Sequence, residues 1–150
     1  MIYLDNSATT RPFDGVIDVM DRCMREQYFN ASAAYKPAVD VDRAMRECRK
    51  TIAAQLGIQE SGVIFTGGGT ESDNWAVFGI ADALEDKGNH IITTKIEHHA
   101  MLHSCEFLEK HGYDVTYLGI GPDGRIKLDE LEAAITDKTI LISVMMVNNE

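Results

Sequence analysis

The sequence predicts an α/β fold in which a mostly parallel sheet is covered by helices on both faces. From residue 59 onward, short runs rich in β-branched residues alternate with stretches of helical periodicity. The last run, from Thr139 to Val147, is almost uniformly apolar, as in strands buried on both sides. Gly88 and Gly112 stand where two of the helices should end. Such alternation implies right-handed crossovers and a three-layer α/β/α arrangement.

Two helices are expected before the alternation begins. Between Pro12 and Tyr28, apolar residues recur at offsets of three and four, and Pro12 suits a first helical turn. A second helix is expected from about Pro37 to Leu56, and Gly57 supplies its end. Each helix has an apolar stripe that predicts one buried face. The chain is therefore divided into residues 1–58, a loop with helices, and 59–150, the first part of an α/β domain.

Four strands and three further helices complete the predicted domain. The expected strands are Val63 to Thr66, Ile91 to Thr94, Val115 to Leu118 and Thr139 to Val147. The expected helices are about Glu71 to Lys87, Ala100 to His111 and Leu128 to Ile135. In open α/β sheets, ligands bind beyond the carboxyl ends of the strands. The candidate functional segments are therefore Gly67 to Asp73, Lys95 to His99 and Asn148 to Glu150.

Composition limits the classes of function. The 150 residues are 45% hydrophobic and 25% charged, which is typical of a globular protein. The net charge of -10 opposes the phosphate neutralisation on which nucleic-acid binding depends, so no nucleic-acid partner is expected. No apolar run approaches the roughly 20 residues that cross a bilayer, so we expect a cytoplasmic protein with no membrane partner. Cys23, Cys48 and Cys105 lack a Cys-x-x-Cys spacing and are expected as reduced thiols.

A triple-glycine bend, Gly67 to Gly69, follows the first expected strand. Glycines allow close backbone approach, and Thr70 with Asp73 would cap the following helix. Free amides at the helix start and the hydroxyls of Thr70 and Ser72 would hold a phosphate dianion. No Lys-Ser or Lys-Thr follows the glycines, and the dinucleotide fingerprint is only partly met. On the bend alone, a plain turn with a helix cap is the alternative.

Glu97, His98 and His99 follow the second expected strand. His99 and His103 are four residues apart on an expected helix, which suits a metal ion. However, the Glu precedes both histidines and no distant ligand set is evident, so we expect no metal site. A ring that faces a ligand and a surface or helix-capping histidine pair are the alternatives. The amides after the last strand, Asn148 and Asn149, would orient a ligand oxygen or form an ordinary polar turn.

Four segments occur together in one order and spacing. They are Tyr3 to Thr10, Ile64 to Asn74, His90 to His98 and Val147 to Glu150. Together they resemble the cysteine desulfurases, the NifS-like branch of the class V aminotransferases, which use pyridoxal 5′-phosphate (PLP). The resemblance runs from end to end. It implies the N-terminal portion of the large domain of a PLP-dependent transferase of fold type I.

The resemblance also implies roles for individual residues. The amide of Gly69 and the amide and hydroxyl of Thr70 would hold the PLP phosphate. His98 would be the catalytic residue that stacks on the pyridine ring and helps to move protons. Asn149 would hydrogen-bond the phenolic oxygen of the cofactor, and Asn30 would lie near the substrate carboxylate. The implied reaction converts L-cysteine into L-alanine and an enzyme-bound persulfide, which supplies sulfur-acceptor proteins for iron-sulfur clusters or thiolation. The family also implies a homodimer.

Members of the resembled family are more than twice as long as this chain. Their Schiff-base lysine, the aspartate at the pyridinium nitrogen and the persulfide cysteine lie after the Asn-Asn-Glu motif. Residues 59–150 would then be the first part of the PLP-binding domain, with its C-terminal part absent. We therefore expect the chain alone to be inactive and PLP to be attached only in a full-length parent. Lys95 aligns with an ordinary family position and Cys105 lies in a helical pattern, so neither replaces the missing groups.

Several alternatives remain open at the level of sequence. Phe29 to Ala33 departs from the Gly-Asn-Pro-Ser-Ser of the family, which leaves the substrate open. Another class V PLP enzyme, such as a selenocysteine lyase or an aminotransferase, is one alternative. A nonenzymatic, Rossmann-like phosphate-binding fragment is another. The family pairs its first strand with its last, so Val63 to Thr66 would lack neighbours here. The strand that ends at Val147 would likewise expose an unpaired edge, unless the sheet rearranges or another chain covers it.

Overall fold

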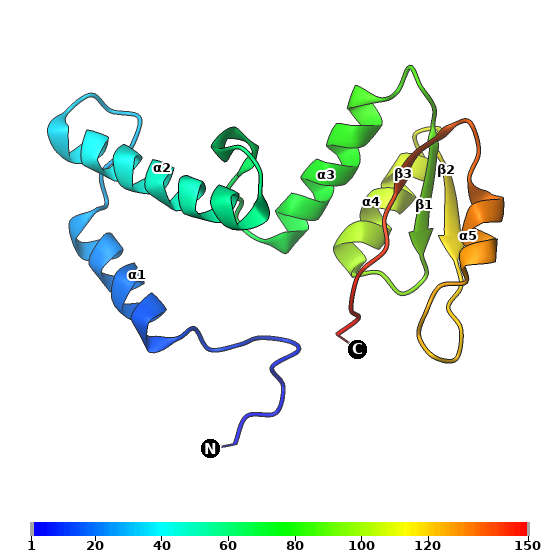
Figure 1. Cartoon of the computed structure of the whole chain (residues 1–150), viewed down its shortest axis with the longest axis horizontal. Helices are drawn as coiled ribbons and strands as arrows, with labels where there is room; N and C mark the ends of the chain where they lie inside the picture. The colour runs from blue at the N-terminus through cyan, green and yellow to red at the C-terminus, as the bar shows by residue number, and fades with distance from the viewer. Residues whose placement is uncertain (1, 150) are drawn as a thin grey trace. The chain divides into compact units, whose positions relative to one another are not determined.

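The computed structural model describes residues 2–149, which form two compact units divided between Phe65 and Thr66. Each unit is described by itself (Figure 1). The first unit contains α1 (Asp14–Glu26), α2 (Lys36–Leu56) and the 3-10 helix η1 (Glu60–Gly62). The second unit contains, in chain order, α3 (Gly69–Ala83), β1 (His90–Thr94), α4 (His99–Glu109), β2 (Asp114–Leu118), α5 (Leu128–Ala134) and β3 (Thr139–Ile142).

The sheet of the second unit is parallel and has the strand order β2-β1-β3. Every residue of the central strand β1 is buried, whereas β3 is only half-buried. The predicted α/β class with a parallel sheet is confirmed. The prediction of a central, doubly buried strand from Thr139 to Val147 is wrong, because β3 ends at Ile142 and pairs with β1 alone. Within the described residues, β3 therefore leaves the open edge that the sequence predicts.

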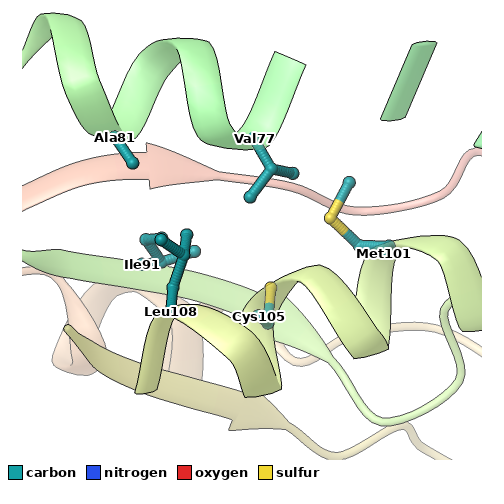
Figure 2. Packing of buried hydrophobic residues seen from close by; sticks show 6 residues of the cluster. All are labelled: Val77, Ala81, Ile91, Met101, Cys105 and Leu108. Atoms are coloured by element: carbon teal, nitrogen blue, oxygen red, sulfur yellow. The ribbon is translucent and has the colours of Figure 1, made fainter. Parts of the chain in front are cut away.

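Helices cover both faces of this sheet. α3 and α4 lie on one side and α5 lies on the other (Figure 1). The core cluster comes from α3, β1 and α4, and its side chains point toward one another (Figure 2). Its members are Val77, Ala81, Ile91, Met101, Cys105 and Leu108. The predicted three-layer arrangement is thus confirmed for the second unit, and the core lies between its sheet and the α3–α4 pair.

The predicted strand from Val63 to Thr66 is wrong. These residues form an extended connection with no strand beside them among residues 2–149. A strand needs a neighbour for its N–H and C=O groups, and β-branched residues alone do not supply one. Gly88 does not end a helix either, since α3 already stops at Ala83. A side chain at Gly88 would collide with the backbone of Lys138, so this glycine serves close packing.

Both predicted N-terminal helices are present, but their buried faces are not. α1 begins at Asp14, two residues after Pro12, and contains no buried residue. In α2 only Ala38 and Ala53 are buried. The helix ends at Leu56, and Gly57 follows as the predicted stop, in the left-handed conformation at φ 67°. Periodicity therefore predicts these helices, whereas the partner for their apolar stripes is not among the residues of the first unit. No helix within residues 2–149 combines the length and apolarity that crossing a membrane requires.

Candidate functional site

Four of the five candidate residues belong to segments at one end of the second unit. The start of α3, the connection from β1 to α4 and the segment after β3 lie toward the same end (Figure 1). Parallel strands bring their carboxyl ends to one edge, which explains this gathering. Gly69, Thr70, His98 and Asn149 lie on these segments. Asn30 belongs to the first unit.

The glycine bend is stabilised by side chains that differ from the predicted caps. Gly68 is the N-cap of α3 and no side chain caps this helix, so the prediction of a cap from Thr70 and Asp73 is wrong. Instead, the Glu71 carboxylate accepts a hydrogen bond of 2.5 Å from the amide of Gly67. The bend is thereby held from within the first turn of α3.

Hydroxyl groups reinforce the same bend. Thr66 Oγ1 lies 3.2 Å from the carbonyl oxygen of Gly68 and 2.7 Å from Ser72 Oγ. Ser72 Oγ also lies 3.3 Å from the Gly68 carbonyl oxygen. The Ser72 hydroxyl is therefore committed to the bend, which corrects the expectation that it joins Thr70 in holding an anion.

The start of α3 nevertheless fits a phosphate group. The amides of Gly69 and Thr70 belong to the first turn of α3, where no intrahelical acceptor exists. The amide of Ser72 does have such an acceptor, because it lies 3.1 Å from the carbonyl oxygen of Gly68. A Cβ atom built at Gly68 or Gly69 would meet nothing within 4 Å, so the bend is open on that side. Two amides and the exposed Thr70 hydroxyl are thus available to an anion, as at other helix starts.

His98 is the N-cap of α4. Its Nδ1 accepts a hydrogen bond of 3.1 Å from the amide of Ala100, and its ring is exposed. Since Nδ1 is the acceptor, the proton of the neutral ring is assigned to Nε2. The structure thus shows a helix-capping histidine whose Nε2 edge is not used by the cap. Within residues 2–149, no three potential ligand side chains are arranged to hold a metal ion.

A buried carboxylate holds the segments that carry His98 and Asn149. Glu97 is 8% exposed, and its Oε1 accepts hydrogen bonds from Thr94 Oγ1 at 2.9 Å and from the Met145 amide at 2.8 Å. Asn148 Nδ2 donates to the Ile96 carbonyl at 2.9 Å. These bonds of Glu97 and Asn148, which we call the Glu97 clamp, link the end of β1 to the chain that follows β3. His98 is the next residue after Glu97, and Asn149 is the next residue after Asn148.

Sequence reasoning did not assign this role to Glu97 or Asn148. It weighed Glu97 as a member of a possible metal cluster and grouped Asn148 with Asn149. A carboxylate three residues after the end of a buried strand needs donors if it is buried too, and this could have identified the clamp. Asn149 itself is exposed, and Glu150, the last residue of the predicted segment, lies outside the described residues.

Asn30 stabilises a turn of the first unit. Its Oδ1 accepts a hydrogen bond of 3.0 Å from the amide of Ser32, and its carbonyl accepts one of 3.0 Å from the amide of Ala33. The side chain is exposed and its amide nitrogen is not used in this turn. The expected position near a substrate carboxylate stays a prediction.

Cys105 is a core residue, as predicted. It is 0% exposed and lies in the apolar cluster (Figure 2). Burial, followed by the negative charges of Glu109 and Glu97, raises the pKa of its thiol to about 11. The thiol therefore stays protonated near neutral pH, where a nucleophilic cysteine has to be a thiolate. Lys95, in contrast, is exposed after β1.

Comparison with known proteins agrees with this geometry. The family described as Aminotransferase class-V matches residues 2–150. A protein named cysteine desulfurase IscS from Methanosarcina thermophila is 50% identical over 149 residues, which are 99% of this chain and 37% of the relative. A solved structure described as a NIFS-like protein matches with a TM-score of 0.94 at 38% identity, over 99% of this chain and 41% of that one. SspA in complex with cysteine matches with a TM-score of 0.91 at 38% identity, over 99% of this chain and 43% of that one.

Fold and site together define an α/β domain in which a glycine-rich helix start lies at the carboxyl edge of a parallel sheet. With the match across residues 2–150, the chain belongs to the class V aminotransferase family. It spans 37–39% of the length of the curated relatives that it matches.

Proposed function

We propose that these residues are the N-terminal portion of a PLP-dependent cysteine desulfurase. The observation that carries the proposal is the placement of the α3 start, His98 and Asn149 on segments at one edge of one sheet. Curated relatives that share half or nearly half of the residues are named cysteine desulfurases. Residues 59–150 would then be the first part of the PLP-binding domain, and in the sequence they follow the loop and helices of residues 1–58.

In this proposal the Gly69 amide and the Thr70 amide and hydroxyl bind the PLP phosphate. The donors suit the group, because two amides of the first helical turn, at the positive end of the helix, stand beside an exposed hydroxyl, and the glycine bend before them leaves open space. The amide of Gly67 already donates to the Glu71 carboxylate and is not available to the phosphate. The phosphate would therefore contact only donors of the first turn of α3. These hydrogen bonds would orient the cofactor without a covalent bond to this chain.

His98 and Asn149 would orient the ring end of the same cofactor. The cap bond at Nδ1 holds the imidazole of His98, which leaves Nε2 to hold or move a proton. The Asn149 side-chain amide would donate to the phenolic oxygen, and the Glu97 clamp would keep its segment in place. When bound, PLP supplies the electron sink for the reaction, and the protein supplies orientation and electrostatics.

L-cysteine is the proposed substrate, with Asn30 near its carboxylate. One solved relative is described in complex with cysteine, which supports this choice. The products would be L-alanine and a persulfide on the enzyme, for transfer to sulfur-acceptor proteins in iron-sulfur cluster assembly or thiolation. We further propose a homodimer in the cytoplasm. The groups that attach PLP covalently and receive the sulfur would come from a longer parent chain, so these 150 residues alone would not turn over cysteine.

Binding of PLP to the 150-residue chain tests the phosphate site directly. We expect PLP to shift the amide NMR resonances of Gly69 and Thr70, whereas pyridoxal, which lacks the phosphate, leaves them unchanged. Thr70→Ala should weaken PLP binding at least 3-fold, while Thr51→Ala, which removes a threonine hydroxyl bonded within α2, serves as the matched control. Borohydride treatment should trap no stoichiometric adduct on any lysine. Equal PLP affinity in Thr70→Ala and the unchanged chain would contradict the assignment.

Turnover needs a parent chain of the relatives' length that carries these residues. There, His98→Ala should lower kcat for sulfide release from cysteine far more than it lowers the unfolding midpoint. Thr70→Ala should instead lower the PLP content after dialysis. Unchanged turnover in His98→Ala would remove His98 from the mechanism.

A further inference from the structure

Asn74 connects the first turns of α3 and α4. Its Nδ2 donates a hydrogen bond of 2.6 Å to the carbonyl oxygen of Thr70, and its Oδ1 accepts one of 3.0 Å from the hydroxyl of Ser104. Ser104 is 2% exposed, and its Oγ also lies 2.8 Å from the carbonyl oxygen of Ala100. Because Thr70 O accepts only, the orientation of the Asn74 amide is assigned without ambiguity.

This series of contacts ends at His98. The amide of Ala100 donates to His98 Nδ1 at 3.1 Å, and the carbonyl oxygen of the same residue shares the single hydroxyl proton of Ser104 with Asn74 Oδ1. One end of the series is therefore Thr70, the proposed phosphate ligand, and the other is His98, the proposed ring ligand. Every link between them comes from a side chain or backbone group of α3 or α4 and its N-cap.

We propose that Asn74 and Ser104 are positioning residues, which set the distance and orientation of the His98 imidazole relative to the Thr70 phosphate site. This inference rests on the proposed function and adds two residues to it. A rigid cofactor requires a fixed spacing between the groups that hold its two ends. Misplacement by about 1 Å is enough to cost a large part of the rate in enzymes.

The location of the pair favours positioning over simple packing. Val77, Ala81, Cys105 and Leu108 already pack α3 against α4 on the side that faces the sheet (Figure 2). Asn74 and Ser104 instead line an open groove of about 560 Å³ whose lining residues come from α3 and α4. Apolar side chains would pack there without fixing how far one helix slides along the other. Directional hydrogen bonds fix that register, because they weaken steeply with distance and angle.

Two variants at position 104 isolate the hydroxyl. Ser104→Thr keeps the hydroxyl and adds a methyl group, and Ser104→Val adds the same methyl group but replaces the hydroxyl with a second one, so the two variants differ only in the hydroxyl. Asn74→Leu removes both amide contacts at similar volume. Thr51→Ala is the matched control, because its hydroxyl makes the same kind of bond to the carbonyl four residues earlier, in α2.

The first readout is the tautomer of His98 in the 150-residue chain, followed by ¹⁵N NMR of the ring nitrogens. We expect Nε2–H to dominate in the unchanged chain, Ser104→Thr and Thr51→Ala. In Ser104→Val and Asn74→Leu, the ratio of Nε2–H to Nδ1–H should fall at least 3-fold. The thermal unfolding midpoint of each variant should stay within a few degrees of that of the unchanged chain. An unchanged ratio would overturn the proposal. Loss of folding in Ser104→Val alone would also overturn it, because the hydroxyl would then serve the fold.

The second readout is turnover in the PLP-loaded parent chain. We expect Ser104→Val to lower kcat about 10-fold with KM and PLP content unchanged, and Ser104→Thr to restore it. If the unchanged parent shows no desulfurase activity while the tautomer ratio responds as expected, the proposed function fails and the positioning of His98 stands. If the parent is active and Ser104→Val has an unchanged kcat, the positioning role fails and the function stands.

Discussion

The two units differ in how well their apolar residues are covered. In the second unit, β1 is wholly buried and contacts helices whose side chains close around Ile91. In the first unit, α1 has no buried residue and Met24 is 67% exposed, although its apolar residues recur with helical spacing. Both units contain amphipathic helices, but only one places a sheet against them. Local periodicity thus specifies a helix, whereas burial depends on a partner surface.

This contrast predicts unequal stability. A helix with little tertiary packing depends on propensity, capping and local ion pairs, which contribute only tenths of a kcal/mol each. A cluster such as that around Ile91 contributes several kcal/mol, because each apolar side chain leaves water completely. Amide exchange should therefore be much slower in β1 than in α1, since exchange from core strands requires larger openings.

Truncation of matched isoleucines in the two units should give the largest difference. Ile91 is 0% exposed and Ile52 of α2 is 38% exposed. We expect Ile91→Ala to lower the free energy of unfolding of the second unit by about 3 to 4 kcal/mol, from lost burial and the cavity left behind. Ile52→Ala should cost below about 1 kcal/mol. Urea titrations monitored by NMR resonances of each unit measure both, and equal losses would mean that the units do not differ in packing.

The Glu97 clamp offers a second test within the well-packed unit. Glu97→Ala leaves the Thr94 hydroxyl and the Met145 amide without their acceptor, which should cost about 2 to 3 kcal/mol. Glu97→Gln keeps an oxygen at this position and should cost less. Amide exchange at Met145 should accelerate in Glu97→Ala, because the Met145 amide loses its acceptor. Unaltered exchange there would show that other contacts hold the segment.

Much of this architecture could be predicted from the sequence. Helical periodicity predicted α1 to α5 within a few residues, and the apolar runs predicted β1, β2 and the start of β3. The prediction of a strand from Val63 to Thr66 is wrong because a strand also requires a neighbouring strand, which residue types do not reveal. The prediction of a doubly buried strand that reaches Val147 is wrong because the apolar residues of a half-buried edge strand resemble those of a central strand.

The sequence indicates the segments of the candidate site but not the contacts between them. Gly69, Thr70, His98 and Asn149 stand in recognisable sequence motifs, and their roles toward a cofactor stay proposals. The contacts of Asn74 and Ser104 were not indicated, because they arise between two helices, 30 residues apart in the chain. Their spacing gave a partial indication, since each lies four residues after a group to which it hydrogen-bonds.

The buried thiol of Cys105 predicts a pH dependence that is specific to the second unit. Its pKa is raised to about 11 in the folded state, so the unfolded chain loses this proton first as the pH rises. The contribution is complete below the unfolded pKa of roughly 8.5 and is lost as the pH approaches 11, at up to about 1.4 kcal/mol per pH unit. Cys105→Ala should flatten this part of the stability profile. At pH 8 a thiol reagent should label Cys23 and Cys48 but spare Cys105, and rapid labelling of all three would contradict its burial.

Surface ion pairs should give the smallest effect and complete the comparison from the side of the first unit. Arg25 Nε lies 2.8 Å from Asp21 Oδ1 on α1, with side chains that are 73% and 53% exposed. Both charges are well hydrated and screened by salt, so Asp21→Asn should change the helix content by little, equivalent to below about 0.5 kcal/mol. Circular dichroism at low and high salt measures the change. A larger loss at low salt would mean that α1 depends on its local charges, as expected of a helix whose apolar stripe lacks a cover within its own unit.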